Sequence, residues 1–143
     1  MWSRDLGATE KVVARFEAGG FWGPALQVDR LAARAGLAAL RGNGPEALAG
    51  FREAVRAYRG LGLAFDEAAA AVDMATLLGA PERDAPDVVA AINAARETLT
   101  RLGARPFLVQ LDKVLAATGS PAAPAAGRAT TVRESVSPGT RPE

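Results

Sequence analysis

The chain contains neither cysteine nor histidine in its 143 residues. The missing cysteine excludes disulfides, thiol nucleophiles and thiolate ligands for zinc or iron–sulfur clusters. The missing histidine removes the commonest metal ligand and the usual general base at neutral pH. Carboxylates occur singly or as the neighbours Asp66 and Glu67, which point in different directions on a helix. The sequence therefore predicts no catalytic residues, no metal site and a protein that is not an enzyme.

Residues 42–47, GNGPEA, match a variant of the glycine pattern that binds dinucleotides. That pattern holds a pyrophosphate only where a strand leads into a helix. Here a helical pattern precedes the glycines, and Pro45 removes one of the N–H donors. The stretch therefore predicts the turn of a helical hairpin, and no cofactor is expected.

Aromatic residues make up only 6% of the chain, whereas alanine occupies 33 positions. Lysine is also scarce, since it accounts for only two of the 17 basic residues. Alanine is the best intrinsic helix former and allows helices to approach closely. A β-sandwich would need many more β-branched and aromatic residues. The composition predicts an all-α fold.

Long apolar runs are missing, as is a basic segment followed by an apolar one at the N-terminus. Neither a transmembrane helix nor a signal peptide is expected, and the sequence predicts a cytoplasmic protein. A basic face is missing too, because residues 1–117 carry 14 basic and 14 acidic side chains. Nucleic-acid binding requires such a face, so neither nucleic acid nor membrane is an expected partner.

Amphipathic patterns separated by glycine and proline predict six helices, over residues 5–19, 25–40, 46–58, 64–78, 87–102 and 107–117. Asp84 and Asp87 are expected to cap the fifth of them. Residues 118–143 contain four prolines and almost no large apolar side chain, so they predict a disordered tail.

A short motif occurs twice: YRGLGLAF at residues 58–65 and LTRLGARPF at residues 99–107. The two Leu-Gly pairs are 41 residues apart in the sequence. Phe65 and Phe107, which follow them, are 42 residues apart because the second copy has one inserted residue. We expect Gly62 and Gly103 to end their helices in the left-handed conformation, and the leucine before each to lie in the core. A period near 40 with two helices per period is typical of an α-solenoid.

Ala47, Phe51 and Ala54 form an A-x3-F-x2-A pattern that resembles the second helix of a tetratricopeptide (TPR) repeat. The phrases LAARAGLAALRGN, EALAGFREAVRAYRGLGLAF and LTRLGARPF resemble the degenerate TPR-like C-terminal region of bacterial adenylate/guanylate cyclases and LuxR-type ATPase regulators. The resemblance covers residues 23–117. It implies a short right-handed solenoid, with a partial unit over residues 1–22, full units over 23–63 and 64–104, and a terminal helix over 105–117. It also implies a regulatory module or fragment of a bacterial signal transduction system that binds a protein or peptide partner.

In TPR arrays the first helix of each pair lines the concave groove, and six polar residues of this chain are expected there: Gln27, Arg30, Arg34, Arg41, Asp66 and Asp73. One interpretation is a groove that recognises an acidic peptide through arginine. The other is ion pairing of Arg30 or Arg34 with Asp66 or Asp73 between units.

The N-terminal helix carries an apolar stripe that has no preceding helix to cover it, comprising Leu6, Val13 and Phe16 with Trp2 just ahead. We expect this edge to bind a partner or a second copy of the chain. Phe21 and Trp22 are expected either to fill the first junction or to form a docking patch. The sequence thus favours a non-catalytic protein–protein interaction scaffold, with a ligand-sensing module as the alternative.

Overall fold

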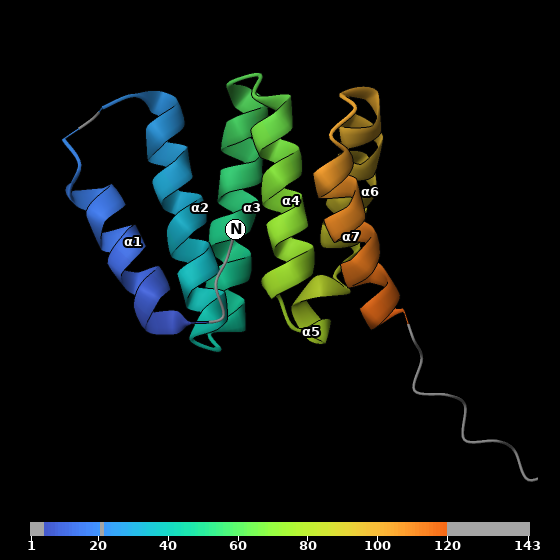
Figure 1. Cartoon of the computed structure of the whole chain (residues 1–143), viewed down its shortest axis with the longest axis horizontal. Coiled ribbons are helices and arrows are strands. Elements are labelled where there is room, and N and C mark those ends of the chain that lie inside the picture. The colour runs from blue at the N-terminus through green and yellow to red at the C-terminus, as the bar shows by residue number, and fades with distance from the viewer. Residues whose placement is uncertain (1–4, 21, 120–143) are drawn as a thin grey trace, which may run out of the picture.

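The computed structural model describes residues 5–20 and 22–119, and all the regular structure in them is helical. The helices stand side by side in a row, and consecutive long helices alternate in direction (Figure 1). Their bounds are α1 Leu6–Ala18, α2 Pro24–Leu40, α3 Gly44–Gly60, α4 Ala64–Leu77, α5 Ala80–Arg83, α6 Pro86–Arg101 and α7 Arg105–Thr118. The all-α prediction is confirmed for this part of the chain.

Two hairpins form the centre of the row. The most extensive contacts join α2 to α3 and α4 to α6, and α3 also packs on α4. Helix α4 contacts α2 on one side and α7 on the other, while α1 packs on α2. The helices at the two ends of the row, α1 and α7, therefore have fewer neighbours than those in the centre (Figure 1).

Three long helices end in the same way, at a glycine with positive φ. The φ angles are 79° at Gly42, 71° at Gly62 and 68° at Gly103. At Gly62 the N–H donates to the carbonyl of Arg59, and the N–H of Leu63 donates to the carbonyl of Tyr58. This pair of bonds is the Schellman motif, which satisfies the last carbonyls of a helix. The left-handed caps predicted at residues 62 and 103 are confirmed.

The leucines before these glycines do not lie in the core. Leu61 and Leu102 are exposed, whereas Leu63 and Ala104, which follow the glycines, pack partly buried against the core. The expectation for the leucines was wrong because the left-handed glycine reverses the chain direction. The reversal turns the residue after the glycine, rather than the one before it, towards the preceding helix.

One helix was not predicted. The single turn α5 lies between α4 and α6, and Asp84 ends it. Helix α6 then begins with Pro86 at its first position and Ala85 as its N-cap, without a side-chain hydrogen bond. The predicted capping pair is therefore wrong, because proline already supplies the helical φ and lacks an N–H that would need a cap. Asp87 instead points to Arg52 of α3.

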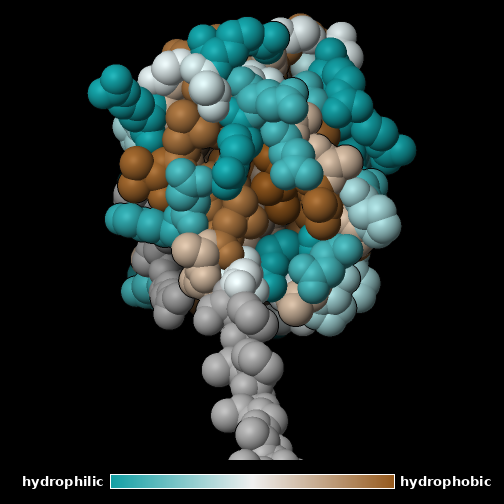
Figure 2. All heavy atoms as spheres, turned by 90° about the vertical axis from the view of Figure 1, so that its right-hand side faces the viewer, coloured by the Kyte–Doolittle hydropathy of each residue, from teal (hydrophilic) through white to brown (hydrophobic). Residues whose placement is uncertain are grey.

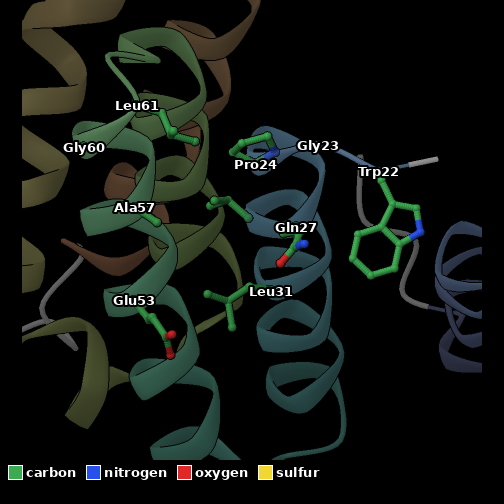
Figure 3. A pocket seen from close by; sticks show the side chains of 10 residues that line it. Trp22, Gly23, Pro24, Gln27, Leu31, Glu53, Ala57, Gly60 and Leu61 are labelled. Atoms are coloured by element: carbon green, nitrogen blue, oxygen red, sulfur yellow. The ribbon is translucent and has the colours of Figure 1, made fainter.

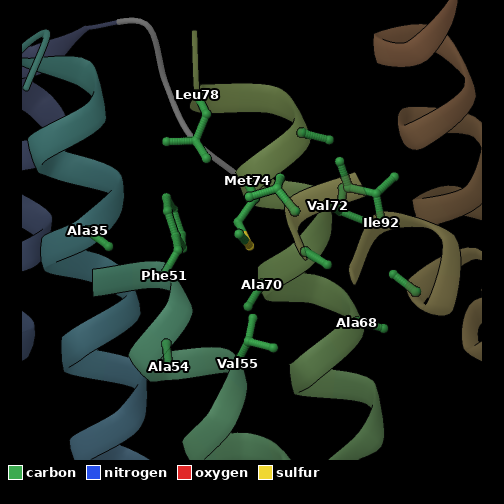
Figure 4. Packing of buried hydrophobic residues seen from close by; sticks show 14 of the residues in the cluster. Ala35, Phe51, Ala54, Val55, Ala68, Ala70, Val72, Met74, Leu78 and Ile92 are labelled. Atoms are coloured by element: carbon green, nitrogen blue, oxygen red, sulfur yellow. The ribbon is translucent and has the colours of Figure 1, made fainter. Parts of the chain in front are cut away.

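The core extends from α2 to α7 and is densest around α3, α4 and α6, where many alanines accompany a few large side chains. Phe51 of α3 and Met74 of α4 are almost completely buried, with Val72, Val88, Leu99 and Leu111. Figure 4 shows Phe51, Met74 and Val55 directed into the space between α3 and α4. Alanine on the facing surfaces leaves little side-chain bulk to hold the helices apart, so a few large residues fill the remaining volume.

No helix within residues 5–20 and 22–119 combines the length and the apolar character required to cross a membrane. Helix α7 extends to Thr118, close to the predicted end of the terminal helix at residue 117. The tail predicted from residue 118 lies, from residue 120 onward, outside the described residues, as do Trp2 and Phe21.

Candidate functional site

The structure divides the six predicted groove residues among three places. The arginines of α2 contact α1: Arg41 binds Glu10 through two nitrogens, at 2.7 and 3.1 Å, and Arg34 forms an ion pair with Glu17. Arg30 donates a hydrogen bond to the backbone carbonyl of Gly19 at 2.7 Å. Helix α1 therefore lies along the stripe that was predicted to face a ligand.

A signal for this contact is present in the sequence. Glu10 and Glu17 are seven residues apart on α1, and Arg34 of α2 is seven residues before Arg41, the C-cap of that helix. In an antiparallel helix pair, equal spacing brings both pairs into register, two turns apart. Each exposed pair contributes less than about 1 kcal/mol to stability, so their main effect is to set the register of α1 on α2.

The two predicted aspartates of α4 lie near a buried tyrosine. The Tyr58 hydroxyl donates a hydrogen bond of 2.6 Å to Asp29 of α2. Burial raises the pKa of Tyr58 far above its usual value, and the charges of Asp29, Asp66 and Asp73 raise it further. This cluster is a carboxylate-rich surface around one neutral phenol, and it joins α2, α3 and α4.

Gln27 lies at a third place, an open hollow of about 930 Å³ between the beginning of α2 and the end of α3. Figure 3 shows Pro24, Gln27 and Leu31 of α2 across from residues of α3 and its C-cap, Leu61. Trp22 stands at the rim beside the beginning of α2, and 82% of its surface is exposed. The interpretation that Trp22 fills the junction is wrong; its exposure fits the docking interpretation.

The α3 wall of this hollow, the residues Glu53, Ala57 and Leu61, was not singled out from the sequence. Its members are spaced by four, so they form one stripe of the helix. That stripe contains one charged, one small and one large apolar residue, and it therefore lacks the hydrophobic pattern by which a buried face is recognised. The sequence therefore carries no local signal that distinguishes this stripe.

The N-terminal stripe is more covered than predicted. Val13 is only 7% exposed and packs towards α2, and Phe16 is half-buried. Leu6 is 36% exposed, and Val12, which lies on the outer side of α1, is 66% exposed.

The opposite end of the row also has an apolar surface. Figure 2 shows the end face formed by α6 and α7, with apolar residues at its centre and polar side chains around them. The exposed large apolar residues of these two helices are Val89, Leu102 and Val109. Both ends of the row thus expose some apolar surface.

Among the described residues, no three acidic side chains are grouped so that they could hold a metal ion. Comparison of the chain with family models, with curated proteins and with solved structures finds no match. The functional argument therefore depends on the surfaces described above.

Proposed function

We propose that this chain is a non-catalytic protein–protein interaction scaffold, a regulatory module or fragment of a bacterial signalling or transcription-regulatory system. We propose further that its helices form a short right-handed solenoid of TPR-like pairs. The hairpins α2/α3 and α4/α6 and the repeated glycine caps at residues 62 and 103 support the repeat. The absence of histidine and cysteine from the whole sequence supports a non-catalytic role.

The observation that carries the proposal is the α2/α3 hollow with Trp22 at its rim. A tryptophan exposed to this degree loses the benefit of burying its large apolar ring, and tryptophan is enriched among residues that dominate binding energy at interfaces. Leu61, also exposed, lines the same hollow. A partner surface that docks over the hollow and the beginning of α2 would cover both, and Gln27 and Glu53 could orient its polar groups.

A sensor of small molecules would need a more enclosed site. Small-ligand pockets bury most of the surface of the ligand, whereas this hollow is open and most of the residues that line it are exposed. The geometry therefore supports a protein or peptide partner over a small ligand.

Photo-crosslinking tests the proposal. The full chain carrying benzoylphenylalanine at position 22 is expressed in the cells that produce the protein, illuminated, and examined for adducts by mass spectrometry. We expect a protein adduct that disappears when Leu61→Asp is added, because the charge would occupy the hollow. A chain with the photoprobe at the exposed position of Lys113 is the control. No adduct at position 22, or equal adducts at both positions, would contradict the proposal.

A further inference from the structure

A second depression lies on another part of the surface, between α3 and α6. It has a volume of about 520 Å³, and Met74 of α4 contributes to its floor. Helices α3 and α6, which provide most of its lining residues, run in the same direction (Figure 1). We call it the arginine groove, and its lining residues are Arg52, Val55, Arg56, Arg59, Met74, Asp87, Ala90, Ala91 and Ala94.

Three arginines of α3 line one side of this groove. Arg52, Arg56 and Arg59 are spaced by four and three, so they form one stripe of the helix. The opposite side, on α6, offers a single charge, the carboxylate of Asp87, among alanines. The lining therefore carries three positive charges and one negative charge.

The two outer arginines already have partners. Arg52 binds Asp87 through two nitrogens, at 2.6 and 2.7 Å, which raises the pKa of Arg52 and lowers the pKa of the Asp87 carboxyl. Arg59 binds Glu67 of α4 at 2.7 and 3.0 Å. Arg56 lies between them, exposed, and within the described part of the chain it forms no ion pair. Among the described residues, the groove thus presents one unpaired guanidinium, that of Arg56, between two paired ones.

The floor and the α6 side determine what can lie beside that charge. The side chains of Ala90, Ala91 and Ala94 are methyl groups, which neither donate nor accept hydrogen bonds. An extended peptide laid on them would leave its backbone polar groups without partners, at a cost comparable to a lost hydrogen bond for each. A helix satisfies those groups internally, and small apolar residues on one of its faces can approach the methyl groups closely.

We propose that the arginine groove binds an acidic amphipathic helix of a partner protein. A carboxylate of that helix pairs with Arg56, and small apolar residues beside it lie against the alanines of α6. This surface and its partner chemistry are distinct from the α2/α3 hollow and the proposal made for it.

A nucleic acid fits the groove less well. Phosphate binding needs several free cations in succession, whereas Asp87 and Glu67 neutralise two of the three arginines and would repel neighbouring phosphates. A peptide helix needs only one strong contact at the centre, because apolar contact supplies the rest.

The test uses the full chain and a fluorescein-labelled probe peptide built from repeats of Glu-Ala-Ala-Leu-Glu-Ala-Ala. A length of about 20 residues makes such an alanine-rich peptide substantially helical. Fluorescence anisotropy measures its affinity at low ionic strength. The first control is the same peptide with every glutamate replaced by glutamine, and the second is labelled oligothymidylate.

We expect the acidic peptide to bind more tightly than the glutamine peptide. Arg56→Gln should weaken binding about tenfold, the loss that removing one charge-assisted contact produces. Ala90→Glu should weaken binding at least as much, because it adds a negative charge to the α6 side of the groove that competes for Arg56 and repels the acidic peptide. Arg105→Gln, on the exposed surface of α7, is the matched control and should leave the affinity unchanged. Each variant is checked by thermal melting.

Equal binding of the two peptides, or an unchanged affinity in Arg56→Gln, would overturn the proposal. Binding of oligothymidylate that depends on Arg56 would also overturn it, in favour of a nucleic-acid partner. Trp22→Ala should not alter the affinity for the acidic peptide. An unchanged affinity would show that the acidic peptide binds the arginine groove and not the α2/α3 hollow, so the two proposals can be judged separately.

Discussion

Phe65 and Phe107, the two phenylalanines of the repeated motif, pack against each other with their ring centres 5.1 Å apart and their planes at 82°. Each lies in the first turn of its helix, α4 or α7. The motif therefore occurs twice because its two copies meet: the glycine caps bring equivalent helix beginnings side by side, and an aromatic residue from each fills the contact.

A double-mutant cycle measures this contact. Phe65→Leu and Phe107→Leu are made singly and together, and the free energy of unfolding is determined for each by denaturant titration. We expect a coupling energy of about 0.5–1.5 kcal/mol, because edge-to-face aromatic pairs stabilise by that amount beyond their buried area. Additive effects of the two substitutions would show that the rings do not interact in solution.

Gly62 and Gly103 make a second prediction. Replacing either by valine should destabilise the protein by more than about 1 kcal/mol, because a β-branched residue is strained at positive φ. A Cβ added at either site would meet no neighbouring atom within 4 Å, so the strain is conformational rather than steric. Asparagine, which tolerates this conformation, is the matched control and should cost less than valine. Equal melting temperatures for the valine variants and the wild type would contradict the cap assignment.

Two helical glycines of α3 should respond in opposite ways to the same substitution. A Cβ added at Gly50 would lie 2.8 Å from the Cβ of Ala35 in α2, whereas one at Gly60 would meet nothing. Gly50→Ala should therefore destabilise by about 1–3 kcal/mol through overpacking. Gly60→Ala should be neutral or stabilising by up to about 1 kcal/mol through helix propensity. Stabilisation by Gly50→Ala would show that α2 and α3 pack less closely than described.

Local patterns explain which parts of the fold could be predicted. The long helices follow from apolar periodicity, and the caps at residues 62 and 103 from the Leu-Gly motif. The turn α5 was missed because four residues are too few to show a helical period. The position of Asp87 was misjudged because its partner, Arg52, is 35 residues away and the local pattern offered a capping role instead.

The candidate sites were harder to predict, since they depend on which helices become neighbours. The arginine stripe of α2 was assigned to a groove, and the structure places α1 along it. The stripe of Arg52, Arg56 and Arg59 has the same kind of spacing and remains open. Sequence spacing identifies a charged face of a helix, but only tertiary packing decides whether another helix covers that face.

Tyr58 gives a prediction about pH. It is the only tyrosine in the chain, and its pKa is raised by burial and by the hydrogen bond to Asp29. In the unfolded chain the phenol ionises at about pH 10. In the folded protein the raised pKa keeps the phenol neutral at that pH. Its contribution to stability is therefore complete below about pH 10 and declines as the pH rises above that value.

An absorbance titration of tyrosinate tests this directly. Folded protein should show no tyrosinate above pH 10 until the chain unfolds, and the stability difference between wild type and Tyr58→Phe should shrink over the same range. Tyrosinate that forms near pH 10 in protein still folded by circular dichroism would contradict the buried hydrogen bond.

The last prediction concerns self-association at the N-terminal end of the row. Val12 is 66% exposed on the outer side of α1, and Phe16, one turn later, is half-buried. No described helix covers this side of α1, and exposed apolar surface of this kind favours association. We expect the apparent mass in light scattering to rise with protein concentration, and Val12→Glu to keep the chain monomeric.

The choice of position 12 follows from the burial of its neighbour. Val13→Glu would place a charge where α1 packs on α2, so it would unfold α1 instead of reporting on an interface. Val109→Glu, at the opposite end of the row, is the matched control, since Val109 is 52% exposed on α7. If both variants dissociate the assembly, the copies join end to end, α1 of one against α7 of the next. A monomer at every concentration, or dissociation by Val109→Glu alone, would contradict association through the α1 edge.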